Sequence, residues 1–245
     1  MGIWAIGGGG GQPGVTTVAL ALSNVLAKES ASVVLVDLDA DAGVLALRLG
    51  VAPTPGVFTL LDPDRTSAPT PDEIAGAISR TKGGWGLMPG FIGSDQAPLV
   101  DFRKAQHLLK AIAAHVDHVV VDVGRIRPGL SSSICVNVPH LLWVVDPGPE
   151  GAARFLGAVR GLALDDAIPG YVFVNRANRS DAVPGLGSRM ERHFGLQVAA
   201  TAPLAPGSPE TSREMQAGCL QAIRVMDSEA SLQTPATSKW ARPWR

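Results

Sequence analysis

A glycine-rich segment near the start of the chain has the residue types that bind phosphate groups. Five glycines at positions 7–11 follow an apolar segment, and Gly9 to Thr16 fits the pattern GxxxxGKS or GxxxxGKT except at the lysine. In such a loop, backbone amides at the start of a helix converge on phosphate oxygens, and the Thr16 hydroxyl can reach Mg²⁺. Glycines by themselves would equally permit a tight turn. The predicted binding residues are Gly10, Gly11, Gln12, Pro13, Gly14, Val15, Thr16 and Thr17.

Val15 stands where the phosphate-loop pattern has a lysine. A charged hydrogen bond to phosphate contributes about 1.5–3 kcal/mol, so its loss weakens binding about 10- to 150-fold. Phosphate binding can survive such a loss. Hydrolysis of a nucleoside triphosphate is harder to sustain, because the lysine also neutralises charge on the transferred phosphoryl group. We therefore expect nucleotide binding with weak or absent hydrolysis.

Carboxylates follow two apolar segments that read as strands. Residues 33–36 lead into Asp37, Asp39 and Asp41, and residues 119–121 lead into Asp122. Strand alternation places Asp37 and Asp39 on one side at the carboxyl end of the strand, where open α/β sheets bind ligands. Aspartate also ends strands and caps helices, which is the alternative interpretation. We predict functional roles for Asp39 and Asp122, a metal role for the latter, and a supporting role for Asp37.

The elements that would position these residues alternate along the chain. Apolar, β-branched segments are found at 3–6, 33–36, 119–121, 141–145, 171–174 and 198–200. Helical patterns lie between them at 16–27, 101–115, 151–164, 188–194 and 209–217. This alternation predicts an α/β fold with a mostly parallel sheet flanked by helices on both faces. We expect one domain over residues 1–225 and a polar, flexible tail over 226–245.

Composition excludes several classes of protein. The 245 residues carry 22 acidic and 21 basic side chains, so no global basic field favours nucleic acid as a partner. The two cysteines are far apart in the sequence, which argues against a disulfide scaffold or a structural zinc site. The sequence contains no run of eighteen apolar residues, so no membrane-spanning helix is predicted. The expected location is the cytoplasm, with contact at the inner face of the membrane as a further option.

Several motifs in order resemble the MinD/ParA class of deviant-Walker P-loop ATPases. They are the glycine loop, VVLVDLDADAGVLALRLG, VDHVVVDVG, HLLWVVDPGPEGAARFLGAV, YVFVNRA and VAATAPLAPGSPETSREMQAG, which together reach about Arg224. The resemblance implies ATP or ADP with Mg²⁺ as cofactors, and a homodimer. It implies that Thr16 and Asp122 serve the metal and that Asp39 positions the attacking water. Asn175 would bind the adenine edge, unless it is an ordinary turn residue, and Pro203 would flank the base.

The chain departs from the family pattern at two positions. Val15 replaces the P-loop lysine, and Gly10 occupies the place of the signature lysine, which in MinD and ParA reaches the partner's nucleotide. The loop is most similar to that of the CpaE/TadZ branch, which helps place pilus and secretion machinery at a cell pole. The similarity covers only the ATPase-like half of that branch.

The resemblance implies a nucleotide-responsive positioning or assembly factor whose partner is a pilus or secretion ATPase, or a polar scaffold protein. Two alternatives stay open: an active ATPase in DNA partitioning or division-site placement, and a nucleotide-free scaffold. The tail 239–245, KWARPWR, combines basic residues with tryptophan and would bind a membrane surface weakly. A disordered or partner-docking end is the other interpretation of this tail.

Overall fold

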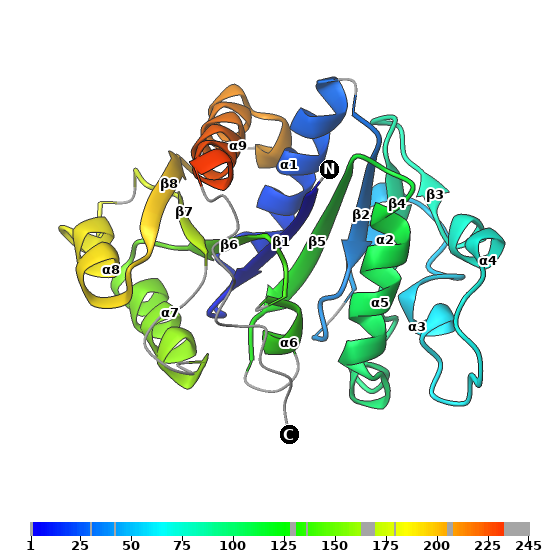
Figure 1. Ribbon diagram of the computed structural model, residues 1–245. Coiled ribbons are helices and arrows are strands. Elements are labelled where there is room, and N and C mark those ends of the chain that lie inside the picture. Colours follow the sequence, from blue (N-terminus) through cyan, green and yellow to red (C-terminus); the bar gives the residue numbers. More distant parts are fainter. Residues whose placement is uncertain are drawn as a thin grey trace.

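In the described part of the chain, eight strands form one sheet in a computed structural model (Figure 1). The structure describes residues 2–29, 31–41, 43–127, 131–135, 137–162, 170–178, 180–204 and 208–232. The strands are β1 (Gly2–Gly8), β2 (Val33–Asp37), β3 (Ser79–Arg80), β4 (Gly86–Met88), β5 (His118–Arg125), β6 (His140–Val145), β7 (Tyr171–Asn175) and β8 (Gln197–Ala202).

The sheet order is β3-β4-β2-β5-β1-β6-β7-β8, and every neighbouring pair is parallel except β3 with β4. The predicted fold class is therefore confirmed. β1 lies between β5 and β6, so the segments that follow these three strands meet at one edge of the sheet.

One face of the sheet is covered by α1 (Val15–Lys28) and α9 (Arg213–Leu232), which contact each other. Their apolar side chains share a core cluster with alternate residues of the central strands, such as Leu35 and Val120. The short helix α2 (Leu45–Leu49) contributes Leu45 to the same cluster. This face holds the helix that begins directly after the glycine loop.

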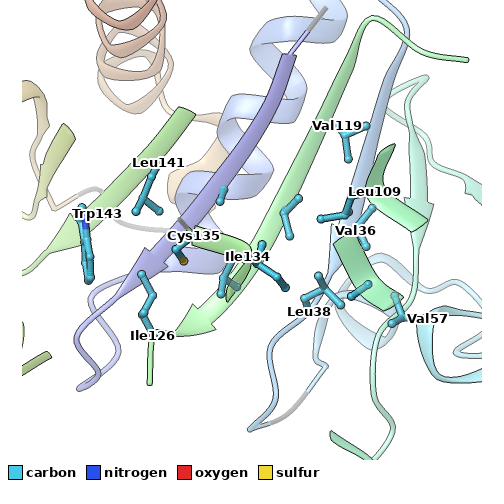
Figure 2. Packing of buried hydrophobic residues seen from close by; sticks show 14 of the residues in the cluster. Val36, Leu38, Val57, Leu109, Val119, Ile126, Ile134, Cys135, Leu141 and Trp143 are labelled. Carbon is cyan, nitrogen blue, oxygen red and sulfur yellow. The ribbon is translucent and has the colours of Figure 1, made fainter. Parts of the chain in front are cut away.

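The opposite face carries a second core cluster, part of which Figure 2 shows. This cluster holds the strand residues that point away from α1, including Val36, Val119 and Trp143, and they pack against the remaining helices. These are α3 (Val57–Leu60), α4 (Pro71–Gly76), α5 (Phe102–Ala113), α6 (Ser132–Cys135), α7 (Pro149–Leu162) and α8 (Leu186–Phe194). The 3-10 turn η1 (Ala97–Leu99) contributes Ala97 to this cluster, and a second 3-10 turn, η2 (Pro209–Thr211), precedes α9.

The structure differs from the sequence-based prediction at the sheet edge and near the C-terminus. Strands β3 and β4 were not predicted, because two- and three-residue strands carry no usable periodicity. The helix predicted at 209–217 is divided into η2 and α9.

α9 extends to Leu232, because Met226 is still buried against the sheet. The first residues of the predicted tail are thus helical, and residues 233–245, with the KWARPWR segment, lie outside the described residues. None of the helices described is long and apolar enough to cross a bilayer.

Candidate functional site

Three polar residues lie at or near the carboxyl ends of β2, β5 and β7 on the α1 face of the sheet. Asp37 ends β2, Asp122 lies in β5, and Asn175 ends β7, and all three side chains are buried. The residues two positions earlier in β2 and β5, Leu35 and Val120, belong to the core cluster that packs against α1. Because side chains alternate between the faces of a strand, the polar residues continue this row at its carboxyl end.

The glycine loop brings the start of α1 to this row. Gly14 is the N-cap residue with a φ of 94°, and no side chain caps the first turn of α1. The amides of that turn therefore remain available to an anion. The Val15 side chain is buried and packs against Gly8 of β1. The Cγ2 atom of Val15 would lie 3.0 Å from a Cβ atom added to Gly8. The residue at the lysine position thus contributes to packing.

Asp122 is completely buried, and its two carboxylate oxygens have different surroundings. Oδ1 accepts a 3.0 Å hydrogen bond from the Gly124 amide, whereas Oδ2 has no hydrogen-bond partner among the described residues. Burial raises the pKa of Asp122 to about 7. A polar interaction with the Thr16 side chain lowers this pKa, and the negative charge of Asp39 raises it. An unpartnered buried carboxylate oxygen beside a threonine hydroxyl fits a hydrated Mg²⁺, which binds hard oxygen ligands.

Asp37 supports the segment that carries Asp39. Its Oδ1 accepts from the Asp39 amide at 3.2 Å, and its Oδ2 accepts from the Leu45 amide at 3.3 Å. Burial raises the pKa of Asp37 well above its ordinary value, and the neighbouring Asp122 carboxylate raises it further. These bonds fix the turn between β2 and α2.

Asp39 lies over the end of β5. Its half-buried carboxylate contacts the Cα region of Gly124, and its Oδ1 accepts from the Asp41 amide at 3.0 Å. Asp41 in turn forms an ion pair with Arg127. The structure therefore brings Asp39 close to Asp122. No group of three or more His, Cys, Asp or Glu suited to a metal occurs in the described ranges, so Mg²⁺ here would depend on Thr16, Asp122, water and ligand oxygens.

Asn175 braces the glycine loop, a role that its sequence context did not indicate. Its Nδ2 donates a 2.8 Å hydrogen bond to the carbonyl of Pro13, and its Oδ1 accepts from the Arg176 amide at 2.9 Å. The amide group also lies directly against Gly14. Pro203 follows Ala202, the register partner of Asn175 in β8. The two residues predicted to contact adenine therefore lie at the carboxyl ends of the neighbouring strands β7 and β8, and their contact with a base stays a prediction.

A cavity of about 470 Å³ adjoins the loop on the side of α7. Its lining comprises Gly11, Asp146, Gly148, Pro149, Glu150, Gly151, Arg154, Arg176 and Asp181. Arg176 donates from Nη1 to Asp146 at 3.0 Å, and the Asp146 side chain is only 9% exposed. Apart from Gly11, none of these residues had a predicted role, because no local pattern indicates that they reach the loop.

The chain matches no protein-family model and no curated protein sequence. It is similar to solved structures, among them MinD in the MinC:MinD cell division complex of Aquifex aeolicus (TM-score 0.71, 18% identity, 93% of this chain and 96% of that chain). A putative plasmid partition protein of Borrelia burgdorferi bound to AMPPNP aligns with a TM-score of 0.66 and 17% identity, over 93% and 98% of the two chains.

A third similar structure is cobyrinic acid a,c-diamide synthase of Mycobacterium smegmatis with ADP and magnesium (TM-score 0.67, 17% identity, 93% and 96% coverage). At these identities the similarity shows the fold. The protein has the fold of MinD/ParA-type P-loop ATPases, and its function has to be argued from its own residues.

Proposed function

We propose that the protein binds ATP or ADP with Mg²⁺ at the loop of residues 9–17. The observation that carries the proposal is the buried, unpartnered Oδ2 of Asp122, which lies near Thr16 in the uncapped first turn of α1. Thr16 and Asp122 would hold the metal, and the backbone amides of residues 10–17 other than Pro13, which has no N–H, would bind phosphate oxygens. When bound, Mg²⁺ neutralises part of the phosphate charge.

Calorimetric titration with Mg-ATP and Mg-ADP tests this proposal. The wild-type protein is expected to show saturable binding, and Thr16→Ala is expected to weaken it at least tenfold. Thr59→Ala is a matched control, because Thr59 lies in α3 and its hydroxyl accepts only a 3.4 Å bond from the Gly56 amide. Absence of heat with millimolar nucleotide would overturn the proposal and favour a nucleotide-free scaffold.

Hydrolysis is proposed to be slow or absent, because the loop offers no lysine to the transferred phosphoryl group. Asp39 is the residue that would position an attacking water, since its carboxylate lies at the mouth of the Asp122 site. Any residual turnover should therefore disappear in Asp39→Ala. Rapid ATP hydrolysis by the wild-type protein that is lost in Asp39→Ala would instead support the alternative function, an active ATPase in DNA partitioning or division-site placement.

The proposed cellular role is a nucleotide-responsive positioning or assembly factor for a pilus or secretion system. Support comes from the fold, which MinD bound to MinC and a plasmid partition protein also have, and from Gly14-Val15-Thr16-Thr17, which resembles the CpaE/TadZ loop. Nucleotide would shift the population toward a homodimer or a partner-binding state. Sedimentation velocity with and without Mg-ATP tests the dimer, and loss of polar localisation in Thr16→Ala cells tests the role.

A further inference from the structure

The glycine loop has no positive charge of its own. Residues 7–17 contain no lysine, arginine or histidine. Three carboxyl groups, those of Asp37, Asp39 and Asp122, lie near the carboxyl ends of β2 and β5. A polyphosphate entering this site would add several negative charges, so other parts of the fold must supply cations if it is to bind.

Arg125 reaches the loop from one side. It is the last residue of β5, the strand that pairs with β1. A Cβ added to Gly10 would lie 2.9 Å from the Arg125 Nε and 3.2 Å from its Cδ. The guanidinium therefore occupies the space that a side chain at position 10 would need. Arg125 is exposed and forms no ion pair with any residue that the structure describes.

Arg154 reaches the loop from the other side. It lies in α7, which follows β6, the second neighbour of β1. A Cβ added to Gly11 would lie 2.7 Å from one terminal guanidinium nitrogen, Nη1. Its Nη2 is 3.5 Å from the Glu150 carboxylate, whose side chain is 88% exposed, so this ion pair is weak. Arg154 also lines the cavity beside the loop.

Other arginines around the site already have closer acidic partners. Arg127 pairs with Asp41, Arg48 pairs with Glu210 at 2.9 Å, and Arg176 pairs with the buried Asp146 at 3.0 Å. Among the arginines that the structure describes, Arg125 and Arg154 are thus the two at the loop that can turn to a ligand without breaking a strong ion pair.

We propose that Arg125 and Arg154 form an arginine clamp that binds the β- and γ-phosphates of the nucleotide, in place of the cations that the loop lacks. The clamp rests on the proposed nucleotide binding. One guanidinium group comes from β5 and the other from α7, so they approach adjacent glycines from opposite sides, and each can offer two parallel N–H donors to phosphate oxygens. They make this site specific for polyphosphates.

Charge-removing variants test the clamp. Arg125→Gln and Arg154→Gln are each expected to raise the Kd for Mg-ATP about 10- to 150-fold, because each removes a charged hydrogen bond. Lysine at either position should recover part of that loss, since the charge remains without the bidentate geometry. Arg192→Gln is the matched control, because Arg192 is exposed in α8 and its Nε donates to the Ser188 carbonyl.

The titrations use Mg-ATP and inorganic tripolyphosphate, with thermal unfolding as a check on folding. Wild-type binding of Mg-ATP with both glutamine variants within twofold of it would overturn the clamp and leave the proposed function standing. Binding of tripolyphosphate but not Mg-ATP, lost in the glutamine variants, would overturn nucleotide binding and restrict the clamp to free polyphosphate. Binding of neither probe to the wild-type protein would overturn both.

Discussion

Asp37 and Asp122 are register partners on the neighbouring parallel strands β2 and β5, and both side chains are at most 1% exposed. Two carboxylates at this position cannot both ionise without a cost in free energy, because each is removed from water and each repels the other. Burial and this repulsion raise both pKa values. A cation bound at Asp122 would remove part of that cost, so the folded protein is prepared for a positively charged ligand.

The buried Asp122 carboxylate is expected to make stability fall as pH rises. Its pKa is about 7 in the folded protein and lies near 4 in the unfolded chain, so the folded state holds the proton more tightly. The contribution of Asp122 to stability is therefore greatest below about pH 4 and decreases by roughly 2–4 kcal/mol as pH rises to about 7. Asp122→Asn should flatten this profile and raise the Tm at pH 8, because asparagine can still accept from Gly124.

Denaturant unfolding between pH 4 and pH 8 measures this effect. The control is Asp64→Asn at an exposed turn, which should leave the profile unchanged. If Asp122→Asn instead destabilises the protein at pH 8, the interpretation of an unrelieved buried charge is wrong. The same variant should lose Mg²⁺-dependent nucleotide binding, so stability and binding are expected to change in opposite directions.

Asn175→Ala is expected to lower the free energy of unfolding by about 1–3 kcal/mol, because the Pro13 carbonyl would lose the hydrogen bond from Nδ2. Nucleotide affinity should fall as well, since the loop loses its brace. Urea unfolding and calorimetry measure the two effects. Asn178→Ala removes an exposed acceptor of the Leu204 amide and serves as the control. Equal effects of the two variants would contradict the brace.

Gly10→Ala tests the space shared by Gly10 and Arg125. The substitution places a Cβ at a φ of 102°, a strain of about 1–3 kcal/mol, and displaces the Arg125 guanidinium. Gly195→Ala is the control for strain alone, because Gly195 has a φ of 67° and nothing lies within 4 Å of an added Cβ. Both should lower the Tm, whereas only Gly10→Ala should weaken Mg-ATP binding. Addition of Arg125→Ala should then change affinity little further.

The opposite edge of the sheet is expected to respond to acid. Trp4 donates from Nε1 to the Nδ1 of His118 at 3.1 Å and stacks on His140. Burial lowers the pKa of His118 below 6.5, so the unfolded chain takes up the proton first and stability falls as pH drops below about 6.5. His118→Asn keeps an acceptor for Trp4 and should make this loss shallower in thermal unfolding. Exposed His107→Asn is the control, and equal acid sensitivity of both variants would contradict this account.

Local patterns in the sequence determined the fold class and the row of polar residues on the sheet. The glycines between an apolar segment and a helix predicted the turn from β1 into α1. The alternation of side chains along a strand predicted that Asp37 and Asp39 point to the same face of the sheet. The apolar segment before Asp122 predicted that this residue lies at the carboxyl edge of the sheet as well. The prediction of the fold class was confirmed, because it depends on backbone geometry within a few residues, whereas β2 ends at Asp37 and leaves Asp39 in the following turn.

Only the tertiary structure decided which distant residues meet at the loop. The Asn175 bond to Pro13 joins residues 162 positions apart, and the positions of Arg125 and Arg154 depend on β1 lying between β5 and β6. No local propensity encodes the order of strands in a parallel sheet, because that order results from burying apolar faces contributed by the whole chain. The sequence therefore determined the uncharged loop, and the strand order placed the two arginines beside it.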